Sequence, residues 1–304
     1  MYIIYYNTFF AKKQELFSEK KEGEIRPLGA SGTAETKEMP YPLDNLLGMW
    51  YNRSRTMSAP ALCAAEKGYR MNLIHDLKTA VYPNTGTPVI AFFGDSVTHG
   101  AFECIQGEQA GCIFDFDAVY HERLRRMLLT VNPWLPVSII NAGVAGDNAI
   151  TALPRLERDV ISHKPHICVV NFCLNDLSET VEEYTAALRE IFTRLLSSGI
   201  RPILLTPSML NSYVHPDTIP MYKDYAAVTA AWHQSGYMDG YVEAARELAR
   251  ELGIAVADAY AKWKELETDG MDVTANLSNY INHPSRELHQ IFADVLFETL
   301  NGEV

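Results

Sequence analysis

From about residue 70 onward, short apolar runs alternate with longer amphipathic stretches. The apolar runs are continuous rather than alternating, which is typical of parallel strands covered by helices on both faces. They are bounded by Pro, Gly or polar residues, as strands usually are. The pattern predicts five strands, at residues 88–93, 136–140, 166–172, 202–206 and 254–258.

Between and after these runs, apolar residues recur at helical spacing. The stretch 181–196 is the clearest case, and Gly199 follows it as a helix-ending glycine usually does. The predicted helices cover residues 116–131, 150–162, 181–196, 241–252 and 285–300. Strands and helices in this order predict an α/β domain with a doubly wound five-stranded parallel sheet, whose ligand sites lie beyond the carboxyl ends of the strands.

The first part of the chain does not follow this rhythm. Residues 1–66 contain loop signals such as Met39-Pro40-Tyr41-Pro42, and they are predicted to be a partly irregular extension to a domain at 67–304. The apolar run 2–10 is prone to pair as an exposed strand, so we expect it to pack on the domain or on a second subunit. A homodimer through this extension is therefore one of two open alternatives.

Composition narrows the function classes. The 304 residues are 47% hydrophobic, which is enough for a large core. With 38 acidic and 26 basic residues the formal net charge is −12, which argues against nucleic acid and anionic membranes as partners. The charges near the start follow the apolar run 2–10, the reverse of a secretory signal, so we expect a cytoplasmic protein.

The cysteine pattern predicts no metal site and no disulfide framework. There are five cysteines, an odd number, and they form no CxxC pair or Cys/His cluster with metal-ligand spacing. Cys168 and Cys173 lie in or beside a predicted buried strand. We therefore expect thiols in a reducing compartment, and neither a metal nor an organic cofactor.

Polar residues and glycines gather where the predicted strands end, and again before the last helix. The four clusters are Gly94-Asp95-Ser96, residues 141–148, Asn175-Asp176 and His283-Pro284. A parallel sheet would bring them to one edge. There they could perform acyl transfer, with Ser96 as nucleophile, His283 as base, and backbone N–H groups with the Asn175 amide as oxyanion donors. Taken singly, each could also be an ordinary turn or cap residue.

In this arrangement the sequence resembles the SGNH/GDSL hydrolase family from about residue 88 to 296. The resemblance rests on GDS at 94–96, NAGVAGDN at 141–148, the Asn175-Asp176 pair and His283-Pro284, in the family's order. It implies a three-layer, flavodoxin-like α/β/α fold. It also implies that Ser96 is the nucleophile and His283 the base. The oxyanion donors would then be Asn175 and the backbone N–H groups of Gly146 and Ser96.

Two positions depart from the family's pattern. Cys173 stands where the family commonly has the glycine of GxND, which predicts a change in local packing. Tyr280 stands where the family commonly has an aspartate three residues before the histidine. That aspartate would orient the imidazole. A backbone carbonyl, a nearby Asn, or an acid from elsewhere such as Asp272 could replace it, so the third member of the site stays open.

Other polar and aromatic residues have structural interpretations. We expect Asp95, Asp147 and Asp176 to brace turns, and His99 to point away from Ser96 because it lies three residues along a new helix. His289 should be packed or solvated. The aromatic residues after the fourth strand suit either a sugar platform or core and lid packing; they are Tyr213, Tyr222, Tyr225 and Trp232.

The leading hypothesis is a serine esterase that removes a short acyl group, by family precedent acetyl, from a small-molecule or carbohydrate substrate. Two alternatives stand beside it. One is a lipase, lysophospholipase or thioesterase for longer chains. The other is a binding protein whose catalysis has lapsed, an idea motivated by the missing acid at Tyr280.

Overall fold

The computed structural model describes residues 87–106, 111–134 and 136–302. The predicted extension at 1–66, its packing on the domain or a second subunit, and the boundary at residue 67 lie outside these ranges. Within them, no helix combines the length and the apolar character that crossing a bilayer requires.

The five predicted strands form one parallel sheet. They are β1 (Val89–Gly94), β4 (Ser138–Gly143), β5 (Ile167–Asn171), β6 (Arg201–Leu205) and β7 (Ala255–Ala257). Their spatial order is β4-β1-β5-β6-β7, so the first strand lies between the second and the third, the flavodoxin-like order. The predicted fold class is confirmed. Gly94 at the end of β1 is in register with Gly143 of β4 and Asn171 of β5, so the strand ends that precede the polar clusters are neighbours.

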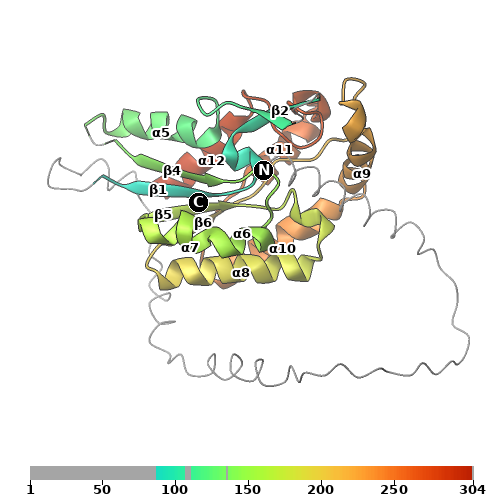
Figure 1. The fold of residues 1–304 in the computed structure, drawn as a ribbon. Coiled ribbons are helices and arrows are strands. Elements are labelled where there is room, and N and C mark those ends of the chain that lie inside the picture. The colour runs from blue at the N-terminus through green and yellow to red at the C-terminus, as the bar shows by residue number, and fades with distance from the viewer. Residues whose placement is uncertain (1–86, 107–110, 135, 303–304) are drawn as a thin grey trace, which may run out of the picture. The chain divides into compact units, whose positions relative to one another are not determined.

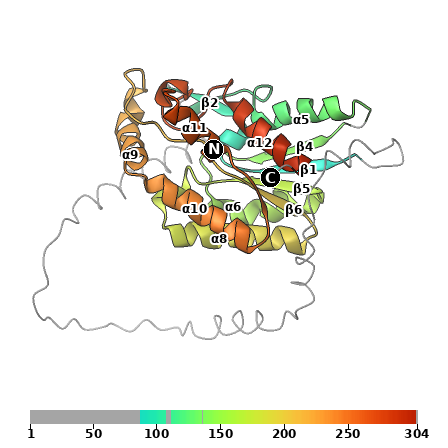
Figure 2. The ribbon, with the colours of Figure 1, turned by 180° about the vertical axis from the view of Figure 1, so that it is seen from behind.

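Helices cover both faces of this sheet (Figures 1 and 2). On one face lie α5 (Tyr120–Val131), α11 (Ala259–Thr268) and α12 (His289–Asn301), and on the other lie α6 (Ala149–Ala152), α7 (Leu156–Asp159), α8 (Val181–Ser197) and α10 (Tyr237–Glu251). Phe92 and Phe93, successive residues of β1, are both fully buried. Successive side chains of a strand point to opposite faces, so both faces of β1 are covered.

The predicted helices are present with local differences. Helix α8 matches its prediction because Thr180 and Glu183 form a reciprocal capping box at its start. The single helix expected at 150–162 is instead divided into α6, α7 and short 3-10 turns, one of which begins with Leu153-Pro154. Proline lacks the N–H that a continuous helix needs, which explains the break.

Four elements were not predicted from the sequence. They are the antiparallel hairpin of β2 (Ala101–Ile105) and β3 (Gly111–Phe114), helix α9 (Lys223–Gln234) and helix α11. The hairpin follows α4 (Ser96–His99) directly, and it matters most because it carries Phe102 and Cys104 next to the site. Its strands are short and only partly buried, so they lack the long apolar runs that revealed the central sheet.

Gly143 should be intolerant of any side chain. A Cβ at this position would lie 2.3 Å from the His99 nitrogen and 2.6 Å from the Thr98 carbonyl carbon, both backbone atoms that cannot swing away. We expect Gly143→Ala to lower the free energy of unfolding by about 1–3 kcal/mol or more, measured by urea denaturation.

Gly240→Ala is the matched control. Gly240 lies in α10 with no atom within 4 Å of the Cβ position, so alanine there should stabilise the protein by about 0.5–1 kcal/mol. A Gly143→Ala protein as stable as the unmodified chain would contradict the close approach of β4 to α4.

Candidate active site

Ser96 is the first residue of the short helix α4, directly after β1. The Asp95 side chain caps this helix by accepting the Val97 N–H at 2.9 Å, as an N-cap aspartate does. The helix ends at Gly100, whose φ of 98° suits glycine. This tight turn fixes the Ser96 hydroxyl at the carboxyl end of the sheet, where it is only 4% exposed.

His283 lies against Ser96 although 187 positions separate them in sequence. Its Nε2 is 2.9 Å from Ser96 Oγ, and its Nδ1 is 2.7 Å from the backbone oxygen of Phe102. A carbonyl oxygen only accepts hydrogen bonds, so Nδ1 carries the hydrogen and donates it. Nε2 therefore presents its lone pair to the Ser96 hydroxyl, the tautomer that a general base requires.

The loop before His283 is organised by Asn279. Its Oδ1 accepts the backbone N–H groups of Ile281, Asn282 and His283 at 2.9–3.0 Å. Asparagine oxygens commonly stabilise turns in this way. Asn279 thus acts on the backbone that carries His283, while the bond to the imidazole itself comes from Phe102.

Tyr280 occupies the position of the expected aspartate, and its ring stacks on His215 with centroids 4.0 Å apart and planes at 7°. Its φ of 57° is in the left-handed region. Asp272 accepts the Tyr213 hydroxyl at 2.8 Å and the Ala275 N–H at 3.0 Å. Of the three replacements left open by the sequence, the backbone carbonyl is the one bonded to the imidazole.

Arg286, which is partly exposed, ties the Phe102 strand to the His283 segment. Arg286 donates to Glu103 at 2.5 Å and to Asp115 at 2.8 Å, and its guanidinium lies 4.4 Å from the centre of the Phe102 ring. These bonds to Arg286 hold the pKa of the Glu103 and Asp115 carboxyls below their usual range. Because Glu103 follows Phe102 in β2, the ion pair holds the accepting carbonyl in place relative to His283.

The loop at 141–148 brings Gly146 and Asn175 together. Gly146 has a φ of 83°, which favours glycine, and it lies between two anchored neighbours. The Ala145 N–H donates to His99 Nδ1 at 3.2 Å, and the Asp147 carbonyl accepts the Asn175 amide at 2.9 Å. Asn175 is 8% exposed. The amide proposed as an oxyanion donor is thus tied directly to the loop that carries Gly146.

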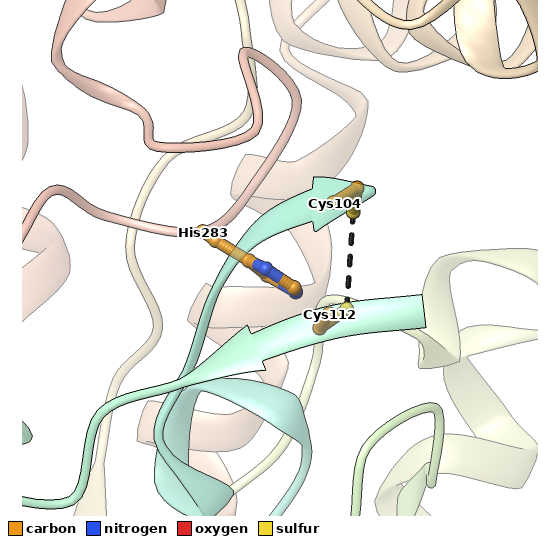
Figure 3. Close-up of side chains that lie close together, drawn as sticks. All are labelled: Cys104, Cys112 and His283. Carbon is orange, nitrogen blue, oxygen red and sulfur yellow. Dashed lines mark hydrogen bonds between the residues drawn. The ribbon is translucent and has the colours of Figure 1, made fainter. Parts of the chain in front are cut away.

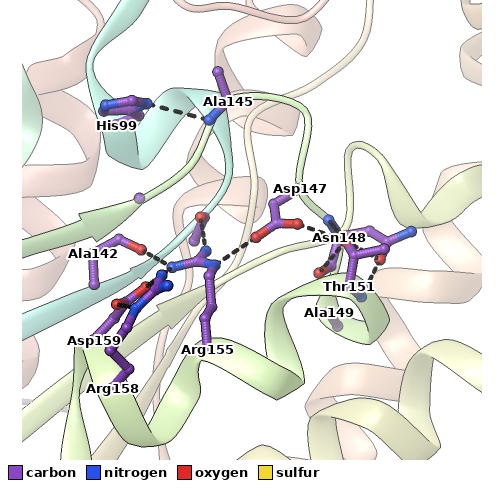
Figure 4. Close-up of polar contacts among 12 residues, drawn as sticks. His99, Ala142, Ala145, Asp147, Asn148, Ala149, Thr151, Arg155, Arg158 and Asp159 are labelled. Carbon is purple, nitrogen blue, oxygen red and sulfur yellow. Dashed lines mark hydrogen bonds and ion pairs between the residues drawn. The ribbon is translucent and has the colours of Figure 1, made fainter. Parts of the chain in front are cut away.

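Arg155 anchors the same loop to the sheet (Figure 4). The sequence alone did not reveal this role of Arg155. Arg155 donates to Asp147 at 2.6 Å, to the Ala142 carbonyl at 2.6 Å and to the Gly94 carbonyl at 3.1 Å. Its guanidinium also lies over the Phe93 ring. One cation therefore joins the ends of β1 and β4 to Asp147. A signal existed in the sequence, an arginine within an otherwise apolar stretch of the predicted helix 150–162.

Three aspartates near Ser96 and Asn175 occupy bracing positions. Asp176 accepts the Ala149 N–H at 2.8 Å, and Asp147 pairs with Arg155. Asp95 caps α4, and burial, with a smaller contribution from the charges of Asp176 and Asp147, raises its pKa to about 7. These contacts agree with the expected role of the three residues in turns.

Two further histidines have contacts of their own. His99 accepts the Ala145 N–H and packs on the Phe114 ring, with centroids 4.6 Å apart. His289 is fully buried and accepts the Tyr120 N–H at 3.2 Å, so it is packed rather than solvated. Both thus serve packing within the domain.

The aromatic residues after β6 make packing contacts. Tyr222 is buried in a small apolar cluster with Ala226 and Ile281, and Tyr225 packs against that cluster. Trp232 stacks on Tyr237 with centroids 5.6 Å apart. Core packing is therefore the better of the two interpretations for Tyr222 and Trp232.

The backbone conformation at Cys173 explains why a glycine suits this position. Its φ of 140° lies in the region that glycine adopts readily and other residues rarely. The thiol is fully buried, which raises its pKa well above the usual value. The departure from GxND therefore places a strained, buried cysteine two residues before Asn175, and local backbone strain is commonly found at functional sites.

The structure also brings together side chains that could hold a metal. Cys104, Cys112 and His283 offer ligand atoms within 4.8 Å of one another (Figure 3). The sequence did not indicate this cluster, because His283 is far in the chain from the two cysteines and the hairpin β2–β3 that pairs them was not predicted.

Comparison with known proteins identifies a matching family and similarly folded structures. Residues 92–291 match the sequence model of the GDSL-like Lipase/Acylhydrolase family. An acetylxylan esterase from Geobacillus stearothermophilus superposes with a TM-score of 0.53 and 23% sequence identity, covering 70% of this chain and 94% of its own. A mutant of it, described as an acetyl-xylooligosaccharide esterase, gives the same values. No curated protein matched the chain.

His283 should titrate far below an ordinary histidine. Burial lowers its pKa to about 4, against the opposing effects of the Phe102 carbonyl and the Glu103 charge. A folded-state pKa below the unfolded value means that the unfolded chain binds more protons between about pH 4 and 6.5. Stability should therefore fall as pH is lowered through this window. NMR titration of the imidazole, assigned with His283→Gln, measures the pKa, and a midpoint near 6.5 would contradict it.

Proposed function

Because the chain belongs to the GDSL-like lipase/acylhydrolase family, we propose that it is a serine esterase that hydrolyses a short-chain, acetyl ester of a small-molecule or carbohydrate substrate. It is a hydrolase of ester bonds, and Ser96 and His283 would form the acyl-transfer pair. The observation that carries the proposal is the chain of contacts from Ser96 Oγ through the His283 ring to the Phe102 carbonyl.

The first half of the reaction would form an acyl-enzyme. Ser96 Oγ attacks the ester carbonyl carbon while its proton passes to His283 Nε2, 2.9 Å away. The imidazolium keeps its Nδ1–H bond to Phe102 and then gives the Nε2 proton to the leaving alkoxide. In the second half a water molecule transfers a proton to Nε2 and attacks the acyl carbon. The carboxylic acid is then released as the bond to Ser96 Oγ breaks, and the Nε2 proton returns to Ser96 Oγ.

The negative oxygen of each tetrahedral intermediate needs fixed donors. We assign this role to the backbone N–H groups of Ser96 and Gly146 and to the Asn175 amide. The bond from Asn175 to the Asp147 carbonyl supports the assignment, because it orients the amide beside Gly146 before substrate arrives. Arg155 supports it indirectly by anchoring Asp147 to the sheet.

A carbonyl in place of a carboxylate changes the energetics of the base. The carbonyl carries a dipole but no full charge, so it stabilises the imidazolium less than an aspartate would. The buried ring consequently stays neutral at neutral pH and is always available to accept a proton. The corresponding disadvantage is that it is a weaker base, which lowers the driving force for proton transfer.

The preference for a small acyl group rests on two observations. Ser96 and His283 are each only 4% exposed, so the acyl carbon must reach a recessed hydroxyl. The similar solved structures are described as acetylxylan and acetyl-xylooligosaccharide esterases. At 23% identity they bear on the fold, and the acetylated carbohydrate is therefore part of the proposal.

Ser96→Ala and His283→Ala should each lower kcat on p-nitrophenyl acetate by at least about 10⁴-fold, since members of a nucleophile–base pair act as a unit. Asn279→Ala should cost much less turnover, because Asn279 holds the loop and touches no reacting atom. Full activity of Ser96→Ala would disprove the mechanism. Failure of the folded protein to react with a fluorophosphonate probe would favour a binding protein without catalysis.

Asp272→Asn is the matched control for the third member of the site. Asp272 is the acid that the sequence offered as a substitute, and the structure pairs it with Tyr213. Its replacement should leave kcat within about twofold of the value for the unmodified protein. Replacement of a triad aspartate by asparagine lowers the kcat of a serine protease by about 10⁴-fold. A loss of that size here would show that a carboxylate does orient His283.

A series of p-nitrophenyl esters from acetyl to decanoyl tests the acyl size. We expect kcat/KM to be highest for acetyl and to fall with each added pair of carbons, because Ser96 is recessed. Acetylated oligosaccharides then test the alcohol part. A preference for decanoyl would replace the acetylesterase with a longer-chain lipase or thioesterase.

A further inference from the structure

Two cysteines of the hairpin lie beside the histidine of the candidate active site (Figure 3). Cys104 in β2 is in register with Cys112 in β3, and their sulfurs are 3.8 Å apart. The His283 ring points toward the pair, and the three ligand atoms lie within 4.8 Å of one another. All three side chains are largely or partly withdrawn from solvent.

The spacing matches a tetrahedral metal ion. Two thiolates at about 2.3 Å from a tetrahedral Zn²⁺ lie about 3.8 Å apart, the separation found between the two sulfurs. A histidine nitrogen at about 2.0–2.1 Å from the same ion would lie about 3.6 Å from each sulfur, so the ring has to approach by little more than 1 Å. A disulfide needs sulfurs about 2.0 Å apart, which is closer than the 3.8 Å found between these two.

His283 also has the outer contact that metal-binding histidines have. Such histidines usually donate their second ring N–H to a carboxylate or a backbone carbonyl, which fixes the ring and its tautomer. The Nδ1–H bond to the Phe102 oxygen is this contact. This bond leaves the Nε2 lone pair to bind a proton or a cation. The lone pair cannot bind both at once.

We propose that Cys104, Cys112 and His283 form a binding site for a thiophilic divalent cation, zinc above all, and that the bound cation reversibly blocks the Ser96–His283 pair. The binding half stands on the cluster alone, whereas the inhibitory half rests on the proposed esterase function. On Nε2 the cation occupies the lone pair that accepts the Ser96 proton. On Nδ1 it would displace the hydrogen that bonds Phe102. Either way the base is lost.

The two negative charges left when the thiols lose their protons balance the charge of the cation. Each thiol releases its proton to solvent as its thiolate binds, so two thiolates and a neutral imidazole give an uncharged site with Zn²⁺. The neighbouring Cys112 and burial raise the pKa of Cys104, so protons compete with the metal and binding weakens as pH falls. Three protein ligands leave a fourth position for water, unlike structural zinc sites, in which four protein ligands close the coordination shell.

The test measures binding and inhibition separately. All proteins carry Cys63→Ser, so that this thiol, which lies outside the described residues, does not contribute to the cobalt spectrum. Co²⁺ serves as a spectroscopic probe, since thiolate ligands give it charge-transfer absorption, and Zn²⁺ displaces it in competition. We expect one Co²⁺ per chain with two thiolates, in the active protein and in the Ser96→Ala variant alike.

Cys104→Ser and Cys112→Ser should each weaken binding and raise the half-inhibiting Zn²⁺ concentration at least about 100-fold, because loss of even an outer contact costs roughly 10- to 100-fold. Activity is compared with each variant's own metal-free rate. Cys168→Ala, a change in the buried strand β5, should bind Co²⁺ and be inhibited by Zn²⁺ as the parent is. After inhibition by Zn²⁺, a chelator should restore the activity of this variant. Circular dichroism confirms that each variant is folded.

Absence of thiolate-to-cobalt absorption, or absorption unchanged in Cys104→Ser and Cys112→Ser, would overturn the binding site. Binding without any effect of Zn²⁺ on a measurable esterase would overturn the inhibition. If no ester is hydrolysed, the cobalt titration of the Ser96→Ala variant still decides the site, so failure of the proposed function is distinguishable from failure of the metal site.

Discussion

One buried hydrogen bond, from His283 Nδ1 to the Phe102 carbonyl, sets the chemistry of the whole site. Because a carbonyl can only accept, the bond fixes the tautomer and directs the other nitrogen to Ser96. Both partners are held by independent contacts. Asn279 fixes the backbone of His283 through three N–H bonds, and Arg286 fixes the strand of Phe102 through Glu103 and Asp115. The arrangement replaces the carboxylate of a catalytic triad with main chain that the fold already supplies.

The parallel sheet provides the second constraint. Strand ends that are distant in sequence meet at one edge, so Gly94 lies beside Gly143 and Asn171. The close approach of β4 to α4 leaves no room for a Cβ at Gly143. Arg155 then joins the ends of β1 and β4 to Asp147, whose carbonyl holds Asn175. Ser96, the proposed nucleophile, and the groups proposed as oxyanion donors are thereby fixed to one rigid edge.

The lack of a carboxylate at His283 links the two proposals. An imidazole that is buried, neutral and oriented by a carbonyl is a base whose lone pair is always available. The same properties describe a good ligand for zinc. Only the neighbouring side chains decide between the two uses, and here both the Cys104–Cys112 pair and Ser96 lie close to the ring. Competition between a proton and a cation for one nitrogen follows from that position.

The sequence alone determined the sheet, most of the helices that cover it and the four polar clusters, because continuous apolar runs and glycines at strand ends are local signals. It placed Ser96 and His283 correctly as neighbours through the family's motif order. It could not identify what orients His283, since a backbone carbonyl has no signature in the sequence and Phe102 belongs to a hairpin without a long apolar run. It also missed the Arg155 anchor and the Cys104–Cys112–His283 cluster. The contact of Arg155 with Gly94 and the approach of His283 to the two cysteines join residues far apart in the chain, which only tertiary folding brings within bonding distance.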